Sequence, residues 1–147
     1  MKIIYISAVV PQDDELPFAR MKNPKEQATY AEAVSIDNNF ITPKDPKVFY
    51  KIMDSEVDLN SANLPRLYAE SVNLTLEEVF FNADKFKLLP KAYIITTKDT
   101  VVSSDTQKMF IEDAGITSIE KISTGHFPMI ADPKKLAGII LKLTESR

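Results

Sequence analysis

Glycine is scarce in this sequence, which has three glycines in 147 residues, at positions 115, 125 and 138. That is well below the usual share of about 7%. Most α/β enzymes need several glycines near phosphates, oxyanions or sharp strand-to-helix turns, and no glycine-rich loop is present here. Cysteine is absent, so disulfide bonds, thiolate catalysis and zinc–thiolate sites are excluded. A single histidine, His126, excludes a histidine-rich metal centre.

Long apolar stretches and a dominant basic charge are also missing. No segment reaches the roughly 18 apolar residues of a membrane span, and the net charge of −3 offers no broad basic face. We therefore expect neither a membrane nor a nucleic-acid partner, and no motif requires a cofactor or a metal. The apolar start is followed by Pro11 and an acidic stretch without a clear cleavage site, which favours a cytoplasmic protein. Length and composition fit a single globular domain over residues 1–147.

Three segments have the pattern of strands in a parallel sheet: residues 3–10, 92–97 and 118–122. The first two are apolar on both faces, which indicates burial on both sides, while the third alternates and belongs nearer an edge. Helices are predicted after the second and third strands. Ser104 and Gln107 form a capping box for one, and Asp132 with Pro133 begins the other. Residues 90–147 thus predict strand, helix, strand, helix with right-handed parallel crossovers, an α/β fold.

Residues 12–89 have a different character, because prolines interrupt them repeatedly. We predict that they form a mostly helical, lid-like insertion between the first and second strands, longer than a plain crossover needs. Within it, Asp54 is predicted to cap a helix that runs towards Leu64. Thr75 is predicted to cap another helix that runs through Phe80.

One acid and the single histidine stand where a parallel sheet would bring them together. Asp99 directly follows the second predicted strand, and His126 comes shortly after the third. Residues just past the carboxyl ends of parallel strands face the crevice in which ligands bind. A carboxylate there can hold the Nδ1–H of an imidazole and stabilise the imidazolium, as in the acid–histidine part of a catalytic triad. Taken singly, such an Asp is more often a turn former and such a His more often structural.

Several stretches of the sequence resemble a known family. They are KIIYISAVVPQ, VFYKIMDSEVDLNSANLPRLYAES, TTKDTVV and TGHFPMIADP. They are similar, in this order, to the sixth strand, the helical lid, the acid turn and the histidine loop of α/β-hydrolases. The closest branch is that of plant-type methylesterases and hydroxynitrile lyases. The resemblance covers nearly the whole chain and implies a partial α/β-hydrolase-like fold. It would hold about three parallel strands, the equivalents of strands six to eight, with flanking helices and the lid.

The serine nucleophile of the resembling family has no counterpart motif here. In that family the order is Ser, Asp, His, with the serine in a Gly-x-Ser-x-Gly elbow. Neither that motif nor the early His-Gly loop, which supplies an oxyanion N–H in the family, occurs in this sequence. The resemblance therefore implies the C-terminal half of an esterase-like protein, inactive alone or dependent on a separate N-terminal half. The alternative is a non-catalytic, degenerate half-domain that acts as an oligomeric binding module.

The first strand, residues 2–10, is the expected site of association. In the resembling fold its other neighbour would be strand five, so here it would form a long, apolar edge. Such an edge exposes unpaired N–H and C=O groups and invites pairing with another chain. We therefore expect either a homo-oligomer or pairing with a separate N-terminal hydrolase half through this strand.

Two residues are candidates for contact with a substrate. Ser7 ends the first strand and would face the pocket of the resembling fold; a nucleophilic role is disfavoured, because a strand-end serine lacks the strained elbow. Phe127 follows the histidine, where the lyase relatives keep a lysine, so the resemblance favours ester hydrolysis over cyanohydrin cleavage. Aromatic residues of the lid would suit a small apolar ester, although such residues are more often plain core.

Overall fold

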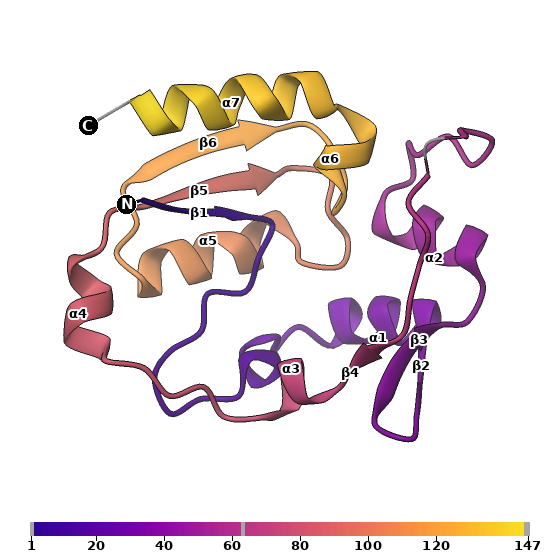
Figure 1. Cartoon of the computed structure of the whole chain (residues 1–147), viewed down its shortest axis with the longest axis horizontal. Coiled ribbons are helices and arrows are strands. Elements are labelled where there is room, and N and C mark those ends of the chain that lie inside the picture. The colour runs from indigo at the N-terminus through magenta and orange to yellow at the C-terminus, as the bar shows by residue number, and fades with distance from the viewer. Residues whose placement is uncertain (1, 63, 146–147) are drawn as a thin grey trace.

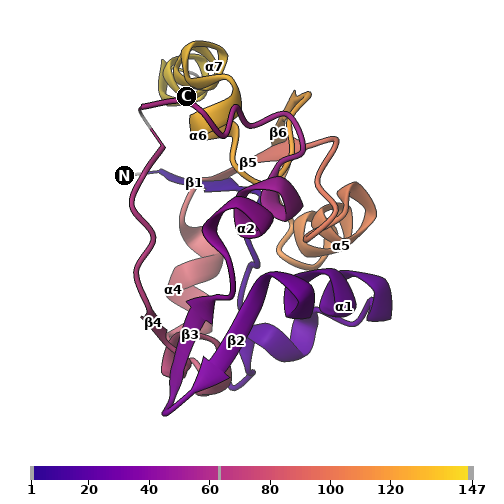
Figure 2. The ribbon, with the colours of Figure 1, turned by 90° about the vertical axis from the view of Figure 1, so that its right-hand side faces the viewer.

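The computed structural model describes residues 2–62 and 64–145 and contains the predicted parallel sheet. Its strands are β1 (Ile3–Ile6), β5 (Lys91–Thr96) and β6 (Ser118–Ile122), in the order β1-β5-β6. Helix α5 (Ser104–Asp113) covers one face of the sheet and α7 (Pro133–Glu145) covers the other, as Figures 1 and 2 show. The short helix α6 (Pro128–Ala131) leads into α7. The α/β prediction is therefore confirmed.

Strand β5 is the centre of the fold, because both of its faces are buried. Tyr93 packs in the cluster that contains Phe110 of α5. Ile94 points the other way and packs with Leu136 and Leu143 of α7. This two-sided burial is what a continuous apolar run predicts for a central parallel strand. The strand predicted over residues 3–10 is shorter than expected: it ends at Ile6, because Ser7 has φ +43°.

The lid segment, residues 12–89, lies between β1 and β5 in the chain (Figure 1). Its middle part extends past the carboxyl ends of the parallel strands, and its last part returns along the sheet to the start of β5. It contains η1 (Pro17–Arg20), α1 (Pro24–Ala33), β2 (Val34–Asp37), β3 (Phe40–Pro43), α2 (Pro46–Met53), β4 (Glu70–Ser71), α3 (Asn73–Leu76) and α4 (Ala83–Leu88). Strands β2, β3 and β4 form a second, antiparallel sheet that the sequence analysis did not predict. A two-residue turn with positive φ at Asn38 and Asn39 joins β2 to β3. Consecutive residues with positive φ are typical of a tight hairpin turn, so the Asn-Asn pair was a usable signal.

Both helices predicted inside the lid segment are wrong. Asp54 ends helix α2 instead of beginning a helix, and its N–H donates to the carbonyl of Tyr50. Helix α3 ends at Leu76, and the chain is extended beyond it, where Val79 forms a bridge with Glu15. At Asp54 a tertiary contact outweighs the local capping pattern, because its carboxylate accepts the N–H of Gly125.

Among the described residues, no helix has the length and apolar character needed to cross a bilayer.

Tyr93 should make the stability of the fold sensitive to alkaline pH. Its buried hydroxyl donates to the carbonyl of Ala8 at 2.7 Å. Burial, and secondly the charge of Asp99, raise the pKa of Tyr93 well above its ordinary value. The unfolded tyrosine ionises near pH 10, roughly, while the folded one keeps its proton. The contribution of Tyr93 is therefore complete below that pH and is lost as the pH rises towards the raised pKa.

We expect the Tyr93→Phe variant to lose about 0.5–1.5 kcal/mol at neutral pH, because the bond to Ala8 disappears. Its stability should then fall less steeply than that of the original protein above about pH 10. Urea unfolding across this pH range measures both effects, with Tyr68→Phe, at an exposed position, as the control. If the free energy of unfolding falls equally steeply above about pH 10 in the original protein and in Tyr93→Phe, the prediction is contradicted.

Candidate active site

Asp99 and His126 form a hydrogen-bonded pair at the carboxyl ends of β5 and β6. The distance from Asp99 Oδ2 to His126 Nδ1 is 2.8 Å. The side chain of Asp99 is fully buried, whereas 24% of the His126 side chain is exposed. This confirms the predicted contact, which followed from the parallel order of the two strands.

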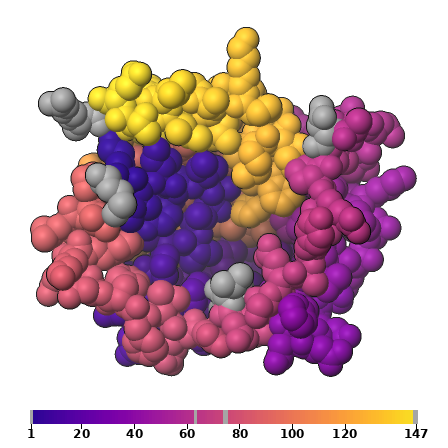
Figure 3. Space-filling model, in the orientation of Figure 1, coloured from indigo at the N-terminus to yellow at the C-terminus, as the bar shows by residue number. Residues whose placement is uncertain are grey.

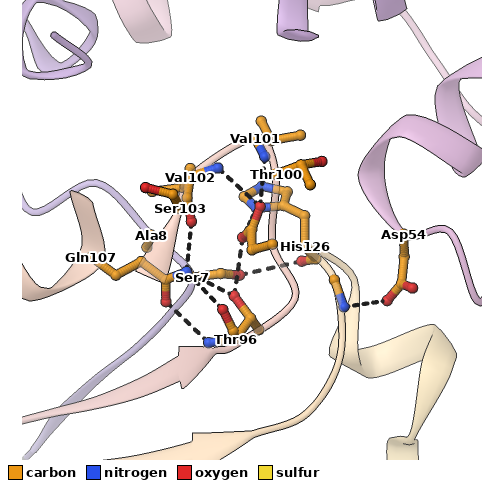
Figure 4. Close-up of polar contacts among 12 residues, drawn as sticks. Ser7, Ala8, Asp54, Thr96, Thr100, Val101, Val102, Ser103, Gln107 and His126 are labelled. Atoms are coloured by element: carbon orange, nitrogen blue, oxygen red, sulfur yellow. Dashed lines mark hydrogen bonds and ion pairs between the residues drawn. The ribbon is translucent and has the colours of Figure 1, made fainter. Parts of the chain in front are cut away.

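The carboxylate of Asp99 is held by four donors. Oδ1 accepts the N–H groups of Val101 and Val102 at 2.8 and 2.9 Å. Oδ2 accepts the hydroxyl of Thr96 at 3.0 Å in addition to the ring of His126. Figure 4 shows these donors converging beside the imidazole. Every contact uses the carboxylate as an acceptor, which suits its ionised form and fixes its orientation.

Gln107 anchors the end of β5 from helix α5. This fully buried amide accepts the N–H of Thr96 at 3.0 Å and donates to the carbonyl of Thr96 at 3.1 Å. It also donates to the carbonyl of Val102 at 2.6 Å. The predicted capping box is therefore wrong: Ser103 is the N-cap, accepting from Thr106 N–H, and Gln107 turns inward. Its role was hidden from the sequence because its partners lie on another element.

The arrangement selects one tautomer of the imidazole. Because Asp99 accepts at Nδ1, that nitrogen carries the proton, and Nε2 remains as the base. His126 also lines a cavity of about 230 Å³. Its walls are mostly apolar and come from the segment after β1, the lid segment and the acid loop (residues 97–102): Ser7, Ala8, Val9, Phe18, Met21, Glu26, Gln27, Tyr30, Val101 and Val102. A base beside an apolar cavity can take a proton from a nucleophile and pass it to a leaving group.

Ser7 lines this cavity, but its hydroxyl is engaged elsewhere. The residue is buried, and Oγ donates to the backbone carbonyl of His126 at 3.2 Å. Its φ of +43° lies in the left-handed region, which is strained for a residue other than glycine. The expectation of an unstrained strand-end serine is therefore wrong. At Ser7 the chain leaves the direction of β1. The bond to the carbonyl of His126 points the Ser7 hydroxyl towards the histidine loop.

Phe127 is not among the residues that line the cavity beside His126. Its ring packs against Phe49 and Tyr50 of α2, with centroid distances of 5.9 and 6.2 Å. It lines a neighbouring cavity together with Tyr30, which borders both. A role of Phe127 in binding a substrate stays a prediction.

Glu26 joins the lid segment to the start of helix α5, beside the loop that holds Asp99. This buried residue of α1 accepts the N–H of Ser103 at 3.0 Å and the hydroxyl of Thr106 at 2.7 Å through Oε1. Ser103 follows the acid loop directly, so the bond ties helix α1 to the start of α5. Sequence analysis gave no reason to single out this glutamate, because its partners lie 77 and 80 residues away.

We expect Glu26→Ala to lower the free energy of unfolding by about 1–3 kcal/mol, because the N–H of Ser103 and the buried hydroxyl of Thr106 lose their acceptor. Chemical denaturation measures the loss. Glu32→Ala, at an exposed position on the same helix, is the matched control and should change stability by less than about 0.5 kcal/mol. Similar losses in the two variants would show that the contact across to α5 contributes little.

No protein-family model matches this sequence. Norfluorocurarine synthase 2 from Strychnos sp is 25% identical over 100 residues, which are 67% of this chain and 37% of that protein. A pyrethroid hydrolase from Sphingobium faniae JZ-2 superposes with a TM-score of 0.81 at 13% identity, covering 99% of this chain and 61% of that one. Polyneuridine aldehyde esterase superposes with a TM-score of 0.73 at 17% identity, covering 98% and 62%.

The chain has part of the α/β-hydrolase fold. It spans about three fifths of the length of the solved structures that it matches, so the fold is partial. This confirms the fold that the sequence resemblance implied.

Proposed function

We propose that this chain supplies the acid and the base of a carboxylic-ester hydrolase. The single observation that carries the proposal is the bond between Asp99 and His126, formed at the edge of an apolar cavity. The four donors around Asp99 support it, because they preorganise the carboxylate that must stabilise an imidazolium. The esterase and hydrolase names of the structural neighbours are in keeping with this chemistry.

In the proposed reaction His126 acts twice. Nε2 takes the proton of a serine hydroxyl while the serine oxygen attacks the ester carbonyl, and then gives that proton to the leaving alkoxide. A water molecule, deprotonated in the same way, then cleaves the acyl-enzyme and frees the serine and the acid. Asp99 keeps its charge throughout and stabilises the imidazolium in each half of the cycle. The apolar lining of the cavity suits a small apolar ester.

The nucleophile of the proposed hydrolase lies outside these residues. No Gly-x-Ser-x-Gly motif occurs among the 147, and the solved relatives are longer than this chain. We propose that the serine and the oxyanion donors come from the remainder of the fold, joined through β1. Within the described part of the chain β1 pairs with β5 alone, so its outer edge can accept a further strand.

Ester hydrolysis with and without a nucleophile-bearing half tests the proposal. The chain is assayed with p-nitrophenyl esters alone, and again after co-production with an N-terminal hydrolase half that carries a Gly-x-Ser-x-Gly motif. We expect turnover, and fluorophosphonate labelling of the added serine, in the combination only. Labelling of the chain alone, abolished by Ser7→Ala, would contradict an external nucleophile. A stable combination without turnover would instead favour a non-catalytic binding module.

A further inference from the structure

The last turn of helix α2 is bound directly to the histidine loop. The carboxylate of Asp54, which is 2% exposed, accepts the N–H of Gly125 at 2.9 Å through Oδ2. The carbonyl of Met53 accepts the N–H of His126 at 2.6 Å. Figure 4 shows Asp54 reaching towards this loop from the side opposite Thr96 and Gln107. Two consecutive peptide N–H groups, the second belonging to His126 itself, are therefore fixed by one turn of the lid segment.

The helix end also contacts the acid loop. The final carbonyls of a helix have no partner within it, so other groups must satisfy them. Thr100, the residue after Asp99, donates its hydroxyl to the carbonyl of Ile52 at 3.4 Å. Lys98, the residue before Asp99, forms an exposed ion pair with Glu56 at 2.5 Å. The end of α2 thus touches both loops of the Asp99–His126 pair.

Gly125 explains why the two segments can come so close. A Cβ atom at this position would lie 2.7 Å from Cγ of Asp54 and 2.7 Å from the carbonyl oxygen of Met53. Any side chain here would push the histidine loop away from α2. The missing side chain of Gly125 and the buried carboxylate of Asp54 therefore form one fitted contact.

We propose that Asp54 is a positioning residue for His126. By holding the N–H of Gly125 it sets the backbone from which the imidazole extends, and so keeps Nδ1 within hydrogen-bond distance of Asp99. Asp54 acts through His126 and has no contact with the reacting atoms. The inference rests on the proposed function for the chemistry that it assigns to His126, whereas the coupling itself needs no catalysis.

The single histidine makes a direct test possible. The ¹⁵N and ¹H resonances of its ring report which nitrogen carries the proton, with no other imidazole to confuse them. We expect the unaltered chain to show the Nδ1–H form. Asp54→Ala should shift the ring resonances towards a mixture of tautomers and make the Gly125 amide exchange about 10-fold faster or more. Asp54→Asn, which keeps the shape and one acceptor oxygen, should fall between them.

Asp45→Ala is the matched control. Asp45 caps the opposite end of α2, where its side chain accepts the N–H groups of Lys47 and Val48. It should lower the unfolding midpoint while leaving the ring resonances and the Gly125 amide unchanged. The proposal is overturned if both Asp54 variants keep the Nδ1–H signature, or if Asp45→Ala alters it equally.

The kinetic constants of the chain combined with the nucleophile-bearing half provide a separate measurement. There, Asp54→Ala should lower kcat about 10- to 100-fold with KM little changed, since misplacement of a catalytic group mainly affects the chemical step. If the combination has no turnover, the proposed function fails while the ring measurement still decides the role of Asp54. If it has turnover and Asp54→Ala leaves kcat unchanged, the positioning role fails alone.

Discussion

Replacing Asp99 with asparagine is expected to lower kcat about 10⁴-fold in the proposed esterase. The side chain would keep its shape, and its oxygen could still accept the N–H groups of Val101 and Val102. Its amide would instead donate to Nδ1 of His126, which moves the ring proton to Nε2. A ring protonated at Nε2 cannot take the proton of the nucleophile, and the negative charge that stabilises the imidazolium is lost as well.

The control is Asp105→Asn, at a fully exposed position on α5, where the carboxylate pairs with Lys108. An exposed ion pair of this kind contributes little to the stability of the fold, so its loss should leave the Asp99–His126 pair intact. We therefore expect kcat to change less than about twofold. NMR of the isolated Asp99→Asn chain should show the Nε2–H tautomer. A kcat within about tenfold of the unaltered value would mean that Asp99 is structural and that His126 works without it.

The position of the acid–histidine pair could be predicted because each step used local information. A continuous apolar run identified β5, an alternating pattern identified β6, and Asp132 with Pro133 identified the start of α7. Gly115 lies just after the end of α5 and has φ +61°, the left-handed conformation that glycine commonly adopts after a helix. Once two strands are parallel, their carboxyl ends meet at one edge, and Asp99 and His126 must come close.

The residues that hold the pair could not be found in the same way. Asp54 bonds to Gly125 across 71 residues, and Glu26 bonds to Ser103 across 77. Sequence patterns assign a polar residue its local role first, as a helix cap or turn, and Asp54 does also accept the N–H of Glu56. The antiparallel sheet of the lid segment is a different case, because the Asn38-Asn39 pair is a local signal for its β2–β3 turn. Its strand β4 has two residues, too few for a strand pattern.

The second large effect is expected for the association of the chain when a residue of strand β1 is replaced. Its residues are half-buried throughout, although the strand is apolar and belongs to the main sheet. Figure 3 shows the indigo surface of the N-terminal residues from Lys2 onwards, between α7 and the segment that leads to β5. An apolar edge of this kind favours association, either with the remainder of a hydrolase in parallel or with a second copy in antiparallel orientation about a two-fold axis.

Replacing Ile6 with lysine should therefore disrupt the complex. A lysine introduced on an edge strand opposes strand pairing, because its charge would be buried by the incoming partner. We expect light scattering at tens of micromolar to show an oligomer, or a complex with the nucleophile-bearing half, for the original chain. The Ile6→Lys chain should be monomeric.

The matched control is Ile36→Lys, on β2 of the lid segment, where the side chain is 64% exposed. It introduces the same charge on another strand and should leave association unchanged. Because Ile6 also packs beside the α7 cluster, near-UV circular dichroism must show that the Ile6→Lys chain is folded. If that chain is unfolded, Ile3→Lys, on the same strand but outside both core clusters, replaces it. A well-folded monomer of the original chain at tens of micromolar, alone and mixed with the nucleophile-bearing half, would rule out β1 as an association edge.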